Sequence, residues 1–255
     1  ESVCTFIGTV GSNPTLSSIR MIKKYIKRNS LLYKLFLYYR LIYKEKFFIQ
    51  RKTYSQSGED IFIVNYMRRH NIKNGKYVDV GAFHPIKYSN TCLLFNKGWS
   101  GINIDLNPTS IDYFKILRPK DKNICCAISY KEKKTKVFIN DIFSPLNTIN
   151  KKHASSFNFD SKTELHFFTK SKKFNNIVKK KFNFLNIDIE GLDYQVLKSI
   201  NLNKYRPNLI CIEILDKKDL KNIKSYLIKL NYRCVKKLIT SYLFAYTNKN
   251  LLRSL

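Results

Sequence analysis

The chain has 255 residues, 44% of them hydrophobic, and its 47 Lys and Arg against 18 Asp and Glu give a formal net charge of +29. The length fits one α/β domain plus an extension, and the hydrophobic content excludes a chain that is disordered throughout. A charge this basic favours a polyanionic partner or an anionic membrane surface. Lysines scattered over a solvated surface explain the same charge, since a nucleic-acid footprint is a localised patch. The charge alone therefore assigns no function.

The cysteines and the hydropathy of the chain bear on its compartment. None of the six cysteines belongs to a C-x-x-C pair, and most lie inside apolar runs, so we expect buried thiols rather than a disulfide framework or a zinc site. Residues 1–20 lack the basic start and apolar centre of a signal peptide, and no apolar run is long enough to span a bilayer. We expect a cytoplasmic protein and leave open a peripheral position at the inner membrane surface.

The first fifty residues differ in composition from the rest. Residues 1–20 are rich in Ser, Thr and Gly and predict a flexible tail or a non-native extension, with Met21 as an alternative start. Residues 21–52 place bases among Ile, Leu, Tyr and Phe at near-helical spacing, which predicts a basic, amphipathic helical extension. Such a helix suits peripheral membrane contact through residues 21–50, and equally a helix that caps the core or forms a dimer contact. The oligomeric state stays open.

Residues 53–250 alternate predicted helices and strands. The segment Ser57-Gly58-Glu59-Asp60 matches a capping box that starts a helix over 59–70, and Gly75 precedes a buried strand over 77–80. A helix near 89–96 ends at Gly98, a second strand ends at Asp105, and Asn107-Pro108 caps the next helix.

The remaining elements complete the predicted sheet. Further strands are expected at 123–128, 136–140, 182–189, 208–214, 232–239 and 242–247, with helices at 192–200 and 219–230. The polar stretch from 144 to about 180 predicts a loop or lid. The alternation predicts a mostly parallel sheet in a three-layer α/β fold, in which the last two strands form a hairpin.

Carboxylates concentrate where the predicted strands end. Five of the 18 acids lie at or beside the ends of apolar strands: Asp79, Asp105, Asp188, Glu190 and Glu213. Burying a carboxylate is costly without a partner, so acids at strand ends of a basic protein indicate ligand, metal or proton-transfer roles. Each acid taken alone also has a structural explanation, such as capping a helix or pairing with a lysine.

The glycine after the first strand limits the choice of cofactor. Gly81 would let the backbone pass close to a cofactor, and Asp105 is placed to accept hydrogen bonds from two ribose hydroxyls. A dinucleotide site would need a fuller G-x-G-x-x-G, but Phe83-His84-Pro85 follows Gly81-Ala82 instead. One glycine and no P-loop favour S-adenosylmethionine over NAD or ATP, because S-adenosylmethionine carries a ribose but no phosphates.

Five sequence blocks in order resemble the FkbM family of S-adenosylmethionine-dependent methyltransferases. They are Tyr54-Ser55-Gln56-Ser57-Gly58-Glu59-Asp60, Val78-Asp79-Val80-Gly81-Ala82-Phe83-His84-Pro85, Ser89-Asn90-Thr91, Gly98-Trp99-Ser100-Gly101-Ile102-Asn103-Ile104-Asp105 and Ile187-Asp188-Ile189-Glu190-Gly191. The resemblance spans about residues 54–247 and implies a Rossmann-like class I methyltransferase fold, with a seven-stranded sheet whose last hairpin inserts one antiparallel strand. It also implies O-methylation, commonly of a sugar hydroxyl or a polyketide.

The resemblance also assigns roles by position. It implies that Asp79, Gly81 and Ala82 line the methionine end of the cofactor, that Asp105 holds its ribose, and that Cys126 and Ala127 border the adenine.

At the reacting end the resemblance points to Asp188 and Glu190, which would face the transferred methyl group, with Glu213 at the next strand end. Asp188, Glu190 and His84 are the candidates for the base that deprotonates the acceptor. Alternatively, Asp188 and Glu190, with Glu213, hold a divalent cation such as Mg²⁺ that lowers the pKa of the acceptor hydroxyls.

Two other functions compete with a small-molecule or glycan O-methyltransferase. The first is a 2′-O-methyltransferase that uses the basic surface to bind RNA; base-amino methyltransferases are disfavoured, because Asp188-Ile189-Glu190-Gly191 replaces their Asn/Asp-Pro-Pro-Tyr motif. The second is a non-catalytic membrane or glycan-assembly partner that retains the fold. Of these partners we expect the small-molecule or glycan acceptor and disfavour nucleic acid.

Overall fold

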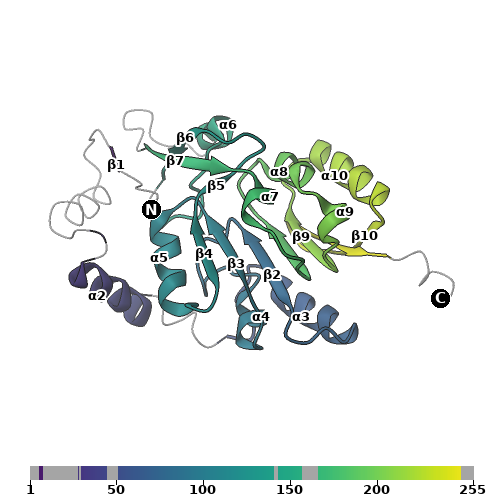
Figure 1. Ribbon diagram of the computed structural model, residues 1–255, viewed down its shortest axis with the longest axis horizontal. Helices are drawn as coiled ribbons and strands as arrows, with labels where there is room; N and C mark the ends of the chain where they lie inside the picture. The colour runs from purple at the N-terminus through teal and green to yellow at the C-terminus, as the bar shows by residue number, and fades with distance from the viewer. Residues whose placement is uncertain are drawn as a thin grey trace.

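The centre of the molecule is a seven-stranded sheet between two layers of helices (Figure 1). The computed structural model describes residues 6–7, 28, 30–44, 51–140, 143–156 and 166–247. In this sheet the strand order is β10-β11-β9-β8-β2-β3-β4. The strands are β2 (Lys76–Val80), β3 (Ser100–Asp105), β4 (Lys122–Cys125), β8 (Phe184–Ile187), β9 (Leu209–Glu213), β10 (Tyr232–Lys237) and β11 (Ser241–Tyr246).

The pairing within this sheet confirms the predicted α/β architecture. Strands β4, β3, β2, β8 and β9 are parallel neighbours, while β11 lies antiparallel between β9 and β10. The sheet is therefore mostly parallel, and its C-terminal hairpin inserts one antiparallel strand, as expected. Because the parallel strands all point the same way, their carboxyl ends meet along one edge of the sheet.

Alternation along the strands builds a separate hydrophobic core on each face of the sheet. On one face Val78, Val80 and Leu185 pack with helices α7 (Phe174–Ile177), α8 (Asp193–Ser199), α9 (Leu202–Tyr205) and α10 (Lys217–Lys229). On the other face Tyr77 and Phe184 pack with α3 (Glu59–Arg69) and α4 (Cys92–Asn96). Successive strand residues point to opposite faces, so β2, β8, β9 and β11 each contribute to both cores.

Two helix starts show how the loops beside the sheet edge are fixed. Helix α5 (Pro108–Leu117) begins as predicted, with Asn107 as N-cap accepting from the amide of Thr109. The expected capping box at the start of α3 is wrong in detail, because Gly58 is the N-cap and has no side chain to contribute. The hydroxyl of Ser55 accepts from the Gly58 amide instead, at 3.1 Å.

A second, smaller sheet corrects two sequence-based expectations. The predicted strand 123–128 is broken at Cys126: β4 ends at Cys125, and β5 (Ala127–Ile128) pairs with β7 in the smaller sheet. The predicted loop or lid contains the seven-residue strand β7 (His166–Lys172), which pairs antiparallel with β6 (Lys134–Phe138). It also contains helix α6 (Lys151–Ser156). Pairing of β7 with β1 (Phe6–Ile7), β5 and β6 fixes this segment, which polarity alone suggested to be loop.

The N-terminal extension is helical where the structure describes it. Helix α2 (Leu31–Tyr39) continues into the π-helical turn η1 (Arg40–Lys44), and both lie within residues 21–52, for which a helical extension is expected. Of residues 1–20 the structure describes only β1 (Phe6–Ile7), which pairs antiparallel with β7; the expected flexible tail and the alternative start at Met21 otherwise lie outside the described residues. No helix in the described part of the chain has the length and apolar character needed to cross a membrane.

Candidate active site

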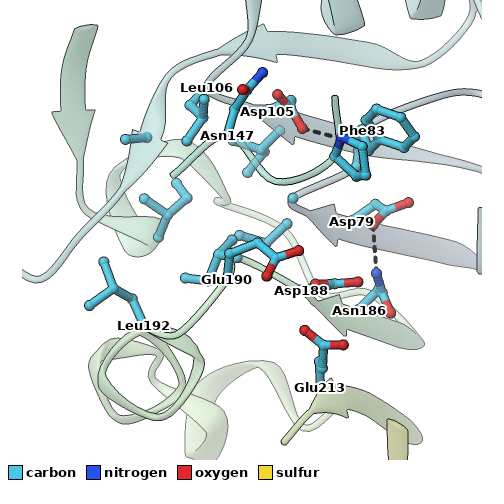
Figure 2. Close-up of a pocket in the computed structure, with 18 of the residues that line it drawn as sticks. Asp79, Phe83, Asp105, Leu106, Asn147, Asn186, Asp188, Glu190, Leu192 and Glu213 are labelled. Atoms are coloured by element: carbon cyan, nitrogen blue, oxygen red, sulfur yellow. Dashed lines mark hydrogen bonds between the residues drawn. The ribbon is translucent and has the colours of Figure 1, made fainter. Parts of the chain in front are cut away.

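One pocket lies outside the carboxyl ends of β2, β3, β8 and β9, at the edge where a parallel α/β sheet binds its ligands. Figure 2 shows acids entering it from opposite sides, with Asp105 at one end and Glu213 at the other. Its lining includes nine of the ten residues expected at the site: Asp79, Gly81, Ala82, Asp105, Cys126, Ala127, Asp188, Glu190 and Glu213. The tenth, His84, does not line this pocket.

The first end of the pocket is built around Asp105, the last residue of β3. One carboxylate oxygen accepts from the amide of Phe83 at 2.8 Å and the other from the amide of Asn107 at 2.7 Å. Burial raises the pKa of Asp105 to about 6, although the hydrogen bonds from Asn107 and Phe83 oppose that rise. A carboxylate offers about four acceptor positions, so two remain for ligand hydroxyls. Asp105 is thus held in place as a hydrogen-bond acceptor.

An apolar wall stands next to Asp105. Leu106 continues from β3, while Cys126 and Ala127 come from the break between β4 and β5. The amide of Cys126 donates to the carbonyl of Asp105 at 2.9 Å, so the break and the acid are tied together. An acceptor for two hydroxyls beside an apolar wall is an arrangement that could hold a ribose and an adenine.

The backbone around Gly81, directly after β2, leaves no room for a side chain at this position. Its φ is +80°, and a Cβ added there would lie 1.6 Å from the carbonyl oxygen of Asp188. The amide of Asp188 also donates to the carbonyl of Val80 at 2.9 Å. We expected Gly81 to let a cofactor approach; the structure shows that its absent side chain lets the loop after β8 pack against the loop after β2.

Asp79 lies at the floor of the pocket and belongs to a buried polar network. Its carboxylate accepts from Thr91 Oγ1 at 2.7 Å. It also accepts from Asn186 Nδ2 at 2.9 Å, the bond that Figure 2 shows as a dashed line. Arg118, which is 1% exposed, donates in turn to Thr91 Oγ1 at 2.8 Å. Burial raises the pKa of Asp79, while these donors and the charge of Arg118 oppose that rise. A chain of hydrogen bonds therefore connects Asp79 through Thr91 to the buried cation Arg118.

Arg118 also fixes the loop that carries part of the pocket lining. Its guanidinium donates to the carbonyl of Pro85 and, at 3.1 Å, to Ser89 Oγ. Tyr88, Ser89 and Asn90 line the pocket directly after this anchor. A buried arginine at the C-cap of α5 thus connects the loop after β2 to the acid at the pocket floor. Arg118 was not predicted from the sequence, since an arginine near a helix end resembles an ordinary surface base.

The second end of the pocket is a cluster of three carboxyl groups. Asp188, Glu190 and Glu213 each place an oxygen within 4.8 Å of the others. Burial raises the pKa of Asp188 well above its usual range, and Glu213, Asp193 and Glu190 add to the rise by repulsion. For Glu190, burial and the charges of Glu213 and Asp193 raise the pKa to about 8. Such a cluster favours the uptake of a proton or a cation.

The turn after β8 is shaped to present these acids. Glu190 has φ +56°, a left-handed conformation that is unusual for a residue with a side chain. Asp193 holds the turn, because its carboxylate accepts from the amide of Ile189 at 3.0 Å and from that of Gly191 at 3.1 Å. Phe83 and Tyr88 have positive φ values too, and both line the pocket. Backbone strain of this kind concentrates at functional sites.

The remaining candidate base, His84, lies elsewhere. It is 3% exposed, and its Nδ1 accepts from the amides of Ile86 at 3.1 Å and Lys87 at 2.9 Å. The lone pair of Nδ1 is therefore engaged by the loop's own backbone. The structure brings Asp188 and Glu190 together with Glu213, and places His84 under the loop, against Tyr113 at a ring distance of 5.0 Å.

The segment after β6, which begins the expected loop or lid, supplies a further wall of the pocket. Leu146 and Asn147, in the segment after β6, line the pocket opposite the sheet edge. Thr148 Oγ1 donates to the carbonyl of Glu190 at 3.3 Å, and Asn150 Nδ2 donates to that of Gly191 at 3.1 Å. The segment from 143 to 150 is thus tied to the turn that carries Glu190.

Comparisons with known proteins agree with this geometry. A family model described as the methyltransferase FkbM domain matches residues 79–234. No curated protein matches the chain significantly.

Among solved structures, the methyltransferase FkbM from Methylobacillus flagellatus KT has 12% identity and a TM-score of 0.47, with 91% of this chain and 59% of that one covered. The chain therefore spans less than two thirds of that protein. The TehB-like SAM-dependent methyltransferase from Corynebacterium glutamicum has 11% identity, coverage of 82% and 97%, and a TM-score of 0.44. The SAH-bound methyltransferase PaMTH1 from Podospora anserina has 8% identity, coverage of 95% and 100%, and a TM-score of 0.43.

These structural likenesses are too distant to carry an argument, and the family match carries the identification. It spans more than half of the chain and includes both ends of the pocket, from Asp79 to Glu213. As the resemblance implied, the sheet has seven strands and its last hairpin inserts one antiparallel strand. The chain belongs to the FkbM family of S-adenosylmethionine-dependent methyltransferases.

Proposed function

We propose that this protein is an O-methyltransferase that acts on a hydroxyl group of a sugar, glycan or other small-molecule precursor. The observation that carries the proposal is the carboxyl cluster of Asp188, Glu190 and Glu213, at the end of the pocket away from Asp105. A hydroxyl acceptor must lose a proton as it is methylated, and a crowded group of acids provides a site for that proton.

The cofactor half of the proposal rests on the first end of the pocket. Asp105 would accept from the ribose hydroxyls, and Leu106, Cys126 and Ala127 would border the adenine. Asp79, Gly81 and Ala82 would line the methionine end. When bound, S-adenosylmethionine supplies an electrophilic methyl group on a sulfonium. The chain's own task is then to orient the acceptor oxygen in line with that methyl group and to remove the proton.

Two ways of removing the proton fit the cluster. In the first, Asp188 or Glu190 acts as a general base, and a pKa of about 8 for Glu190 is close to the range in which such a base works best. In the second, the three carboxylates bind a divalent cation such as Mg²⁺, which lowers the pKa of the acceptor hydroxyl. His84 is the weaker candidate, because its Nδ1 is engaged by the loop and it lies outside the pocket lining.

The test is transfer of a labelled methyl group from S-adenosylmethionine onto host lysate separated into glycan, lipid and RNA pools. We expect label in the glycan or small-sugar pool. Asp105→Ala should reduce labelling at least roughly tenfold at low cofactor concentration, since hydrogen bonds to a charged acceptor are lost. Glu132→Ala, which changes an exposed acid outside the pocket, is the matched control.

The same assay separates the alternatives. Loss of labelling on addition of a chelator would assign the cluster to a cation, and unchanged labelling would assign it to a base. Label confined to RNA, with a steep dependence on salt, would contradict a sugar acceptor and favour the 2′-O-methyltransferase. No transfer into any pool, with a flat calorimetric titration of cofactor, would contradict the enzyme itself and favour a non-catalytic partner.

A further inference from the structure

The helical extension α2–η1 is fixed to the domain by one of its sides. Tyr33, Leu37 and Leu41 are buried there against Tyr113 of α5. The hydroxyl of Tyr33 donates to Asp112 at 3.1 Å, and Arg28 forms an ion pair with the same carboxylate at 2.7 Å. The orientation of the extension is therefore set, and its opposite side must face outward.

That opposite side is apolar. Seven large side chains, here called the outer stripe, are between 47% and 72% exposed: Leu31, Leu32, Leu35, Tyr38, Tyr39, Ile42 and Tyr43. They recur every three or four residues, so they follow one another along one side of the helix. They are half of the fourteen large hydrophobic side chains that are exposed in the described part of the chain, although they come from a single short segment. A soluble surface does not concentrate apolar groups in this way without a partner.

The charge around the outer stripe identifies the kind of partner. Residues 21–52 contain ten Lys and Arg and one acid, Glu45. Within the helix itself Lys34 is exposed beside the stripe. A second copy of this chain would bring another +29 protein against the same basic segment, which like-charge repulsion disfavours. An anionic lipid surface offers both an apolar layer for the stripe and negative charge for the flanking bases.

We propose that the outer stripe docks this protein on a membrane surface rich in anionic lipids. In this position the Leu and Ile side chains enter the acyl boundary, and Tyr38, Tyr39 and Tyr43 lie at the headgroup level, where aromatic rings with a polar end are favoured. Arg40, whose guanidinium carbon lies 3.6 Å from the ring centre of Phe143, connects the docked helix to the segment that lines the active-site pocket.

The first experiment uses the full chain and vesicles of phosphatidylcholine, with or without roughly one-third phosphatidylglycerol. Leu35→Trp places a fluorophore on the outer stripe, while Ile228→Trp places one at a 63% exposed site on α10. The single native tryptophan, Trp99, is 5% exposed and is common to both variants. We expect a blue shift for Leu35→Trp with the anionic vesicles only, and no shift for Ile228→Trp. Equal shifts in both variants, or in neither, would overturn the proposal.

The second experiment removes the stripe. The triple variant Leu31→Ser, Leu35→Ser, Tyr39→Ser should weaken sedimentation with anionic vesicles at least roughly tenfold, because burial of apolar area is lost. Ile228→Ser should not weaken it. All three positions are exposed, so the melting temperature should stay the same. Equal binding by the triple variant, or equal binding to neutral vesicles, would overturn the proposal. A dimer of the parent chain that the triple variant loses, without vesicle binding, would assign the stripe to a second copy.

Discussion

The two ends of the pocket differ in the groups that surround their carboxyl side chains. At the proposed cofactor end Asp105 accepts two hydrogen bonds from backbone amides, and Asp79 accepts two from the side chains of Thr91 and Asn186. At the other end the groups that most affect Asp188, apart from its burial, are carboxyl groups: Glu213, Asp193 and Glu190. The acids at the first end are held by hydrogen bonds before any ligand binds. The acids at the second end repel one another, and this repulsion is relieved only when the cluster takes up a proton or a cation. The proposed cofactor binding and the proposed proton removal therefore fall at different ends of the pocket.

At Gly81 the loop after β2 packs against the loop after β8, which carries Asp188. Replacing Gly81 should therefore lower the stability of the protein more than any other change considered below. Gly81→Ala would place a Cβ 1.6 Å from the Asp188 carbonyl oxygen, so the loops after β2 and β8 would have to separate. We expect a loss of at least about 3 kcal/mol in the free energy of unfolding, measured by urea denaturation. Gly58→Ala is the control: it has a similar φ of +84° and no atom within 4 Å of the added Cβ, so only about 1 kcal/mol should be lost. Equal losses in the two variants would show that backbone strain, and not the contact with Asp188, makes Gly81 necessary.

Arg118 tests the organisation of the cofactor end alone. Arg118→Met keeps much of the volume but removes the donor to Thr91, Ser89 and the Pro85 carbonyl, and it leaves Asp79 without a buried cation nearby. Removing one partner from a buried charged network costs about 3 kcal/mol, and cofactor binding should weaken as Asp79 and the loop lose their positions. Calorimetric titration of cofactor and urea denaturation measure both effects. Lys115→Met, on the same helix with a side chain 59% exposed, should change stability by less than about 0.5 kcal/mol.

Sequence patterns could predict the parts of this site that follow from local order. An apolar run that ends in an acid is visible without a structure, and Asp79, Asp105, Asp188 and Glu213 all lie where such runs predicted. The sheet followed for a similar reason, because alternating strands and helices leave few possible topologies. The side-chain alternation of β7, with Phe167, Thr169 and Ser171 buried, is a further signal of this kind that could have identified a strand.

Partners distant in sequence could not be predicted in the same way. Asn186 binds Asp79 across 107 positions, and Arg118 reaches Thr91 across 27, so neither pairing leaves a local pattern. His84 shows the converse: a histidine beside the cofactor motif suggested a base, but its Nδ1 accepts from the backbone of its own turn. The ends of the expected strand 123–128 belong to different sheets, because the chain leaves the central sheet at Cys126.

The smallest expected effect is the pH dependence of stability at the carboxyl cluster. The folded protein holds the pKa of Glu190 at about 8 and that of Asp193 at about 7, above their ordinary values of 4.5 and 3.8. A raised acid pKa means that the folded state binds protons that the unfolded chain releases. This contribution is therefore fully present below the unfolded pKa values and is lost as the pH rises towards about 8.

Glu190→Gln should reduce that loss, since a glutamine has no proton to release and its neutrality removes a repulsion on Asp188. We expect the melting temperature of the parent chain to fall by a few degrees more than that of Glu190→Gln between about pH 5 and about pH 8. Glu132→Gln is the control, because Asn176 lowers the pKa of Glu132 and its titration lies below this range. If the melting temperature changes equally with pH in the parent and in Glu190→Gln, solvent already screens the repulsion among the carboxylates of the cluster. If Mg²⁺ raises the melting temperature of the parent at high pH and not that of Glu190→Gln, a cation rather than a proton balances the negative charge of the cluster.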